Sequence, residues 1–113
     1  MGPTDSPMVS VPQRLTPVEQ GPSNRSSVLH EADALVNGER NIDYGDPIAD
    51  FRRTADLWSA YLGGVKLQPH DVAAMMSMLK LSRIRWSPEK RDHWVDLAGY
   101  AACGYDCSVR ENL

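Results

Sequence analysis

Apolar residues recur at intervals of three and four along most of the chain after residue 26, whereas strand-like alternation of apolar and polar residues is nearly absent. This period is typical of amphipathic helices. It predicts four helices, over about 27–38, 47–62, 69–85 and 88–104. Connections of about four to eight residues join them. The sequence therefore predicts an all-α protein, a small four-helix bundle.

The expected helix ends rest on residues that start or stop helices. Asp46 is a good N-cap and Pro47 suits a first helical position, as do Pro69 and, after Ser87 as the cap, Pro88. Each expected helix also has an apolar side that should face the core. These sides comprise Val28, Ala32, Leu35; Ile48, Phe51, Ala55, Trp58, Leu62; Val72, Met75, Met76, Leu79, Ile84; and Trp94, Leu97, Ala98, Ala101.

The first 25 residues have a different composition from the rest. They hold five of the eight prolines, set among Ser, Thr, Gln and Gly, with no aromatic residue. Such a segment cannot bury enough apolar surface to offset chain entropy. We therefore expect a disordered Pro-rich tail over 1–25, a helical domain over 26–106, and a frayed end over 107–113. A domain this small buries a limited core, which favours a homo-oligomer.

The overall charge excludes some classes of function. The net charge is −3 and acids and bases are interspersed, so no general basic surface for duplex nucleic acid is expected. No apolar run is long enough to cross a membrane and no secretion signal is evident, which indicates a cytoplasmic protein. Cys103 and Cys107 are too few for a structural zinc site, and we expect free thiols.

The most unusual local pattern is a pair of acids on the last predicted helix. Asp92 and Asp96 are spaced i, i+4 and so project from one side of the helix, where like charges repel. Something should compensate them. One interpretation is a divalent cation, Mg²⁺ or Mn²⁺, held by carboxylate oxygens. The other places Asp92 on the helix dipole and ties Asp96 to an arginine.

Lys80 and Arg83 form a matching basic pair on the preceding helix. They could neutralise phosphate oxygens of a bound nucleotide, with arginine supplying a bidentate fork and lysine a point charge. They could equally pair with Asp92 and Asp96 in a salt-bridge network between the two helices. The two interpretations are compatible, because acids and bases on adjacent helices also describe a polar pocket.

The segment 40–47 offers further candidates in a predicted polar loop. Asp43 and Asp46 could add ligands to a metal held by the acidic pair, and Arg40 is another phosphate partner. Tyr44 is not required by turn chemistry; it could stack on a nucleobase or cover the core. The segment could also be turn chemistry alone, since Asp46 caps a helix.

Four blocks carry a resemblance to a known family: 40–47 (RNIDYGDP), 57–62 (LWSAYL), 80–83 (KLSR) and 92–100 (DHWVDLAGY). Together they resemble a family of small phage proteins labelled a domain of unknown function. More distantly, the chain is similar to MazG-like all-α nucleoside triphosphate pyrophosphohydrolases. That likeness implies Mg²⁺ held between acidic helices, in dimers or tetramers. Those enzymes use Glu-x-x-Glu and Glu-x-x-Asp motifs, whereas this helix carries Asp92 and Asp96 one residue further apart.

Two hypotheses about function follow. In the first, the protein is a Mg²⁺-dependent pyrophosphohydrolase of (deoxy)nucleoside triphosphates, with Asp92 and Asp96 as catalytic metal ligands. Arg40, Tyr44, Lys80 and Arg83 would bind the substrate. In the second, it is a non-catalytic phage protein in the host cytoplasm that sequesters a nucleotide signal or inhibits a host protein. Metal-free nucleotide binding without turnover would favour the second.

Overall fold

The computed structural model of the protein describes residues 23–111, and this part of the chain is helical apart from short connections. The helices are α2 (Asn24–Asn37), α3 (Glu39–Tyr44), α4 (Pro47–Tyr61), α5 (Pro69–Trp86) and α6 (Arg91–Arg110). The all-α prediction is confirmed, and the four long helices correspond to the four predicted. The expected disordered tail lies, up to residue 22, outside the described residues. Its last two residues belong to α2, which begins at Asn24 after Ser23 as the N-cap and not near residue 27.

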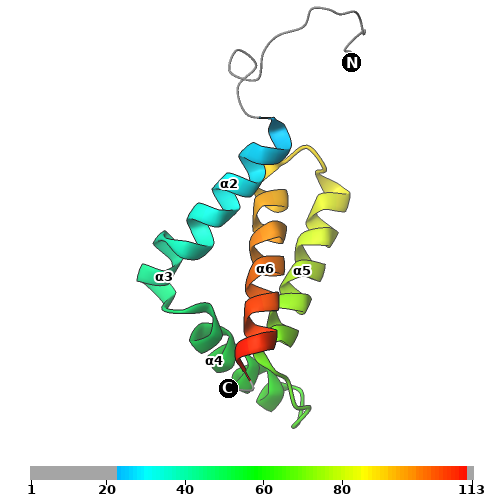
Figure 1. Cartoon of the computed structure of the whole chain (residues 1–113). Helices are drawn as coiled ribbons and strands as arrows, with labels where there is room; N and C mark the ends of the chain where they lie inside the picture. Colours follow the sequence, from blue (N-terminus) through cyan, green and yellow to red (C-terminus); the bar gives the residue numbers. More distant parts are fainter. Residues whose placement is uncertain (1–22, 112–113) are drawn as a thin grey trace, which may run out of the picture.

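Helix α6 is the centre of the arrangement. It runs antiparallel to α5, and α2 lies along its other side, while α4 crosses the lower ends of α5 and α6 (Figure 1). The six-residue α3 connects the end of α2 to the start of α4. All three other long helices therefore contact α6. No helix among residues 23–111 is long and apolar enough to span a membrane.

The buried stripe of α6 differs from the expected one. It consists of Val95, Gly99, Cys103 and Cys107, each four residues from the last. The prediction of a core face at 94, 97, 98 and 101 is wrong by about one position, and Trp94 remains 43% exposed. Small side chains explain the difference, because they let neighbouring helices approach more closely than large ones would.

Two glycines of α6 mark where this approach is closest. A Cβ atom at Gly99 would lie 3.2 Å from Cγ1 of Val36 on α2, and one at Gly104 would lie 3.0 Å from Cβ of Ala73 on α5. Both contacts are tighter than ordinary van der Waals separations. The absence of a side chain at these positions thus sets the distance between α6 and its neighbours.

The segment 39–44 and both ends of α6 also differ from what was expected. Segment 39–44 forms α3 instead of a loop, and Gly45, with φ of +82°, ends it. Helix α6 begins at Arg91 because Pro88 lies in a turn, where its carbonyl accepts a hydrogen bond from Trp94 Nε1 at 2.7 Å. It continues to Arg110 instead of fraying from residue 107, because Cys107 is fully buried.

The core is small and made mostly of small side chains. Phe51 and Ala55 of α4 pack with Val72 and Ala73 of α5 and with the two cysteines of α6. Phe51 also contacts Tyr100, with the ring centroids 6.2 Å apart. Several residues expected in the core, including Leu62 and Leu79, are instead exposed at 48% and 38%. Much of the apolar surface of this domain therefore faces outward.

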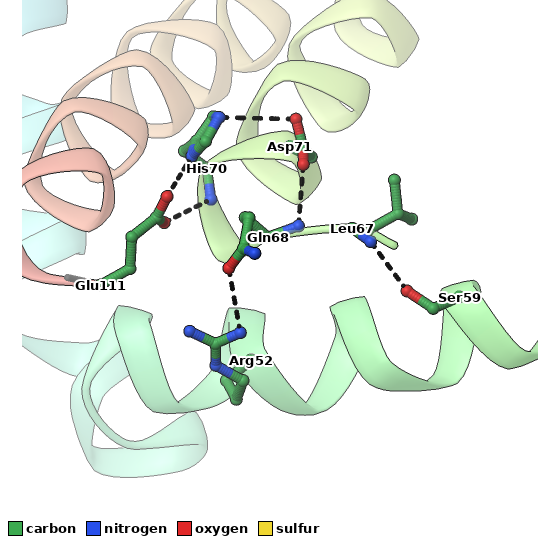
Figure 2. A network of polar contacts seen from close by, with 7 residues as sticks. All are labelled: Arg52, Ser59, Leu67, Gln68, His70, Asp71 and Glu111. Atoms are coloured by element: carbon green, nitrogen blue, oxygen red, sulfur yellow. Dashed lines mark hydrogen bonds and ion pairs between the residues drawn. The ribbon is translucent and has the colours of Figure 1, made fainter. Parts of the chain in front are cut away.

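Polar contacts fix the connection between α4 and α5 to the rest of the fold (Figure 2). The Ser59 hydroxyl accepts a hydrogen bond from the Leu67 amide at 3.0 Å. Arg52 donates to the side-chain oxygen of Gln68 at 3.2 Å. Both contacts hold the residues just before α5 against α4, which limits how far the two helices can swing apart.

The first turn of α5 is closed by two carboxylates (Figure 2). Asp71 accepts the Gln68 backbone N–H at 2.8 Å, completing a capping box. Glu111, whose side chain is 5% exposed, accepts the His70 backbone N–H at 3.2 Å and contacts the His70 ring. These contacts satisfy free backbone donors and place negative charge where the helix dipole favours it.

We predict that Gly104→Leu lowers the free energy of unfolding by about 1–3 kcal/mol, the usual cost of overpacking a core contact. The Cβ of Ala73 that it would meet belongs to a buried residue and cannot rotate away. Urea unfolding followed by circular dichroism measures the change. Ala101→Leu, at an exposed position of the same helix, is the matched control and should be nearly neutral. Equal midpoints for the two variants would contradict the close packing of α5 on α6.

Candidate functional site

A pocket opens between α2, α3, the start of α4 and α6. Its empty volume is about 500 Å³, counting the part open to solvent. Apolar walls come from Val36, Phe51, Val95 and Cys103. The polar lining residues are Arg40, Asn41, Tyr44, Asp50, Asp96 and Tyr100.

Helix α3 supplies the distinctive polar groups of this pocket. The Arg40 guanidinium lies over the Tyr44 ring, 5.1 Å from its centroid, in a cation–π contact. Between them in sequence, Asn41 also lines the pocket. Its side-chain oxygen is buried and accepts no hydrogen bond from residues 23–111. A buried acceptor without a donor costs about 1–3 kcal/mol, so a ligand that donates to it would be stabilised.

Asp96 contacts Lys80 across the α5–α6 interface. The Lys80 ammonium lies 2.9 Å from a carboxylate oxygen of Asp96, and the two side chains are 11% and 33% exposed. The predicted pairing of an acid on the last helix with a base on the preceding one is therefore confirmed for this pair. Asp92 and Arg83 are exposed, and neither forms an ion pair within the described range. The structure does not bring all four residues together.

Asp46 has a structural role at the start of α4. It accepts the Ile48 backbone N–H at 3.2 Å as an N-cap, and both of its carboxylate oxygens bind the Arg110 guanidinium, at 2.9 and 3.1 Å. These hydrogen bonds, that from Arg110 foremost, lower the pKa of Asp46 below its ordinary value. Arg110 also contacts Asp106 at 2.9 Å. Asp43 is exposed on α3.

The four carboxylates predicted as magnesium ligands do not form a cage. Asp96 faces an ammonium group, Asp46 faces a guanidinium group, and Asp43 and Asp92 are exposed. Among residues 23–111, no group of three or more His, Cys, Asp or Glu side chains is placed to hold a metal ion. As arranged, this donor set does not fit Mg²⁺, which takes about six oxygen ligands in near-octahedral geometry.

The two cysteines are free thiols, as expected, and both are buried. Burial raises the pKa of Cys103, which lines the pocket, and the nearby Asp106 carboxylate adds to the effect. Burial, with the neighbouring Cys103 and two acids, raises the pKa of Cys107 to about 11. Both therefore remain protonated near neutral pH, and a protonated thiol is a poor nucleophile.

Sequence reasoning identified Arg40, Tyr44 and Asp96 among the pocket residues but missed Asn41 and Tyr100. With segment 40–47 interpreted as a loop, nothing in the sequence indicated that Asn41 would lie on the same side as Arg40 and Tyr44. A helix there places 40, 41 and 44 on one side, because residues three and four apart are neighbours on a helix surface. Tyr100 follows Gly99 of the buried stripe, which was itself misplaced.

Comparison with known proteins identifies relatives. The family model described as "Domain of unknown function (DUF6378)" matches residues 27–108. The chain is 45% identical over 75 residues to the Gene 55 protein of Mycobacterium phage L5, covering 66% of this chain and 48% of that protein. It is 42% identical over 77 residues to the Gene 55 protein of Mycobacterium phage D29, covering 68% and 50%.

The chain thus spans about half the length of the curated relatives it matches. No solved structure matches it significantly. The predicted resemblance to a phage family of unknown function is confirmed, and that match covers nearly all of the helical domain, from the first turn of α2 to the last turn of α6.

We predict that Asp96→Ala lowers the free energy of unfolding by about 1–2 kcal/mol, because the largely buried Lys80 ammonium loses its partner. The double variant Lys80→Met/Asp96→Ala should recover most of this loss, since neither charge then remains. Urea unfolding of Lys80→Met, Asp96→Ala and the double variant measures the coupling. Additive effects would show that the contact contributes nothing to stability.

We predict a pH-dependent loss of stability in Asp46→Asn, a change that keeps the N-cap oxygen and removes the charge. Because the pKa of Asp46 is lowered on folding from 3.8, its charge stabilises the folded state above that value. This stabilisation is lost as the pH falls through the lowered pKa. The variant should therefore be less stable than the parent at pH 7, with the difference shrinking at acidic pH in urea unfolding. A difference independent of pH would contradict the ion pair with Arg110.

Proposed function

We propose that this chain, a member of the DUF6378 family of phage proteins, binds a nucleoside or nucleotide in its pocket without hydrolysing it. One observation carries the proposal. The buried Asn41 oxygen lacks a donor within residues 23–111, beside the stacked Arg40 and Tyr44, at the lining of a pocket of about 500 Å³. An unsatisfied acceptor in a partly apolar pocket favours a planar ligand with N–H groups.

A nucleobase has this chemistry. Its flat faces suit a pocket walled by Phe51, Tyr100 and aliphatic side chains, and its ring or exocyclic N–H groups can donate to Asn41. Asp50 and Asp96 also line the pocket and accept hydrogen bonds from the same kinds of group. The Asp50 carboxylate would repel a phosphate placed inside, whereas the charge of Asp96 is balanced by Lys80. The base therefore belongs in the pocket.

The phosphate of a nucleotide belongs at the mouth. Arg40 is exposed and its guanidinium can form paired hydrogen bonds to phosphate oxygens. Tyr44, 52% exposed, holds that guanidinium through the cation–π contact. Lys80 is engaged by Asp96, so it and Arg83 contribute less to phosphate binding than the sequence suggests. Affinity should thus depend more on the base than on the number of phosphates.

Hydrolysis is the second candidate, favoured by the MazG-like resemblance of the acidic helix. It would require Asp96 to release Lys80 and to meet other carboxylates around a metal ion. That rearrangement would leave the Lys80 ammonium, whose side chain is 11% exposed, without its partner. Binding without hydrolysis does not require this ion pair to break. We therefore infer sequestration of a nucleotide, which suits a phage protein that lowers the free concentration of a host signal. Inhibition of a host protein remains the alternative if no nucleotide binds.

We predict that calorimetry detects binding of nucleosides and nucleotides in EDTA, and that added Mg²⁺ changes the affinity little. Tyr44→Ala should weaken binding about tenfold through loss of the support for Arg40, a loss equivalent to about 1.4 kcal/mol. Leu57→Ala, on the outer side of α4 at 71% exposure, is the matched control. Absence of binding by every nucleoside and nucleotide tested would contradict the proposal.

We predict that the Asn41→Leu variant changes stability and ligand binding in opposite directions. It keeps the volume of the side chain and removes the unsatisfied acceptor, so we expect the free energy of unfolding to rise by about 1 kcal/mol. Binding should weaken at the same time. An assay of pyrophosphate release with Mg²⁺ completes the test. Release that is abolished by Asp96→Ala would establish the hydrolase instead.

A further inference from the structure

One face of α5 carries no charge over most of its length. At about 100° per residue, Asp71, Ala74, Met75, Leu81, Ser82 and Arg85 all lie within about 60° of Met78 around the helix. We call these seven residues the α5 seam. Lys80 and Arg83 lie about 160° and 140° from Met78, so they leave the seam free of charge between Asp71 and Arg85. Lys80 instead turns inward to Asp96.

The seam is exposed although it is apolar. Met78 is 60% exposed and Leu81 is 52% exposed. The opposite side of the same helix, with Val72, Ala73 and Ile84, is buried in the domain. Apolar side chains therefore lie on two opposite sides of α5, and the domain covers only one of them. Figure 1 shows α5 at the edge of the molecule, with α6 on one side and open space on the other.

We propose that the α5 seam binds a second copy of this chain, with the two α5 helices antiparallel and a two-fold axis passing by Met78. The sequence is self-complementary about that axis. Asp71 meets the partner's Arg85, and the two Met78 side chains meet each other. In the same register Ala74 meets the partner's Ser82, and Met75 meets the partner's Leu81.

Each of these pairs is chemically matched. Arg85 is exposed and forms no ion pair within residues 23–111, so an acid from another chain can pair with it. The small residues Ala74 and Ser82 oppose each other and permit close approach, while Met75 and Leu81 fill the space beside them. A symmetric interface needs one patch that fits itself, and this charge and size pattern does so.

The spacing also suits a helix pair. Asp71, Met78 and Arg85 follow one another at intervals of seven, so they recur along one side of the helix with a drift of only about 20° per step. The helix of 18 residues is about 27 Å long, so the seam covers about two heptads. An interface of that size is small, and small interfaces are weak. We therefore expect dissociation in the micromolar range.

Dimerisation and ligand binding use different surfaces. No residue of α5 lines the pocket, which is formed by α2, α3, α4 and α6. The dimer proposal thus stands whether or not the pocket binds a nucleotide. A dimer at the seam also gives a role to two of the three neighbouring methionines of α5. Met76 packs inward against the core, whereas Met75 and Met78 belong to the seam.

Sedimentation velocity over about 1–300 μM protein tests the assembly, a range that brackets a micromolar dissociation constant. The parent chain should shift from monomer to dimer, and Met78→Glu should stay monomeric because it places two like charges at the axis. Leu57→Glu, at a more exposed apolar position on α4, should dimerise like the parent. Circular dichroism confirms that both variants are folded. A parent chain that stays monomeric, or a Met78→Glu dimer, overturns the proposal.

Crosslinking tests the antiparallel register. The native cysteines are buried, so a thiol introduced on the seam is the accessible one among residues 23–111. With copper–phenanthroline as oxidant, Met78→Cys should form a covalent dimer. Ala74→Cys and Ser82→Cys should each crosslink poorly alone but well when mixed. Efficient crosslinking of Ala74→Cys with itself would indicate parallel helices, and no crosslinking in any variant would exclude the seam as the interface.

Discussion

Close packing along the small-residue stripe of α6 is the constraint on which this fold depends. Gly99 admits Val36 of α2, and Gly104 admits Ala73 of α5, at separations that leave no room for a side chain. This contact fixes α2 and α5 on the two sides of α6. It also shapes the pocket, because Val36 and Gly99, which meet at this contact, both line it.

The helices could be predicted from the sequence because their ends are marked by local chemistry, such as Asp46 before Pro47. The buried face of α6 could not be predicted, because large apolar residues dominate a pattern of periodicity. This helix instead buries Gly99, Cys103 and Cys107 beside Val95. Trp94 shows the effect, since its indole hydrogen-bonds a turn instead of filling the core. The short α3 was missed for a similar reason: a six-residue polar helix depends on contacts beyond its own sequence.

The candidate site was partly predictable for the same physical reason. Opposite charges on adjacent helices indicated the contact of Lys80 with Asp96. The sequence could not show that this contact neutralises the acid, nor that Asp46 is held by Arg110, sixty-four residues away. Long-range pairing of this kind removes carboxylates from a metal site. It leaves Asn41, a lining residue whose buried side-chain oxygen has no donor within residues 23–111, as the distinctive polar residue of the pocket.

The two buried thiols can report how often α6 separates transiently from the helices around it. Cys107 is fully shielded and its pKa is about 11, so an alkylating reagent can reach the thiolate only when α6 separates from its neighbours. The labelling rate of each sulfur then measures how often that part of the helix opens. Because Cys103 borders the pocket and Cys107 does not, the two sulfurs would distinguish local opening at the cavity from opening at the end of the helix.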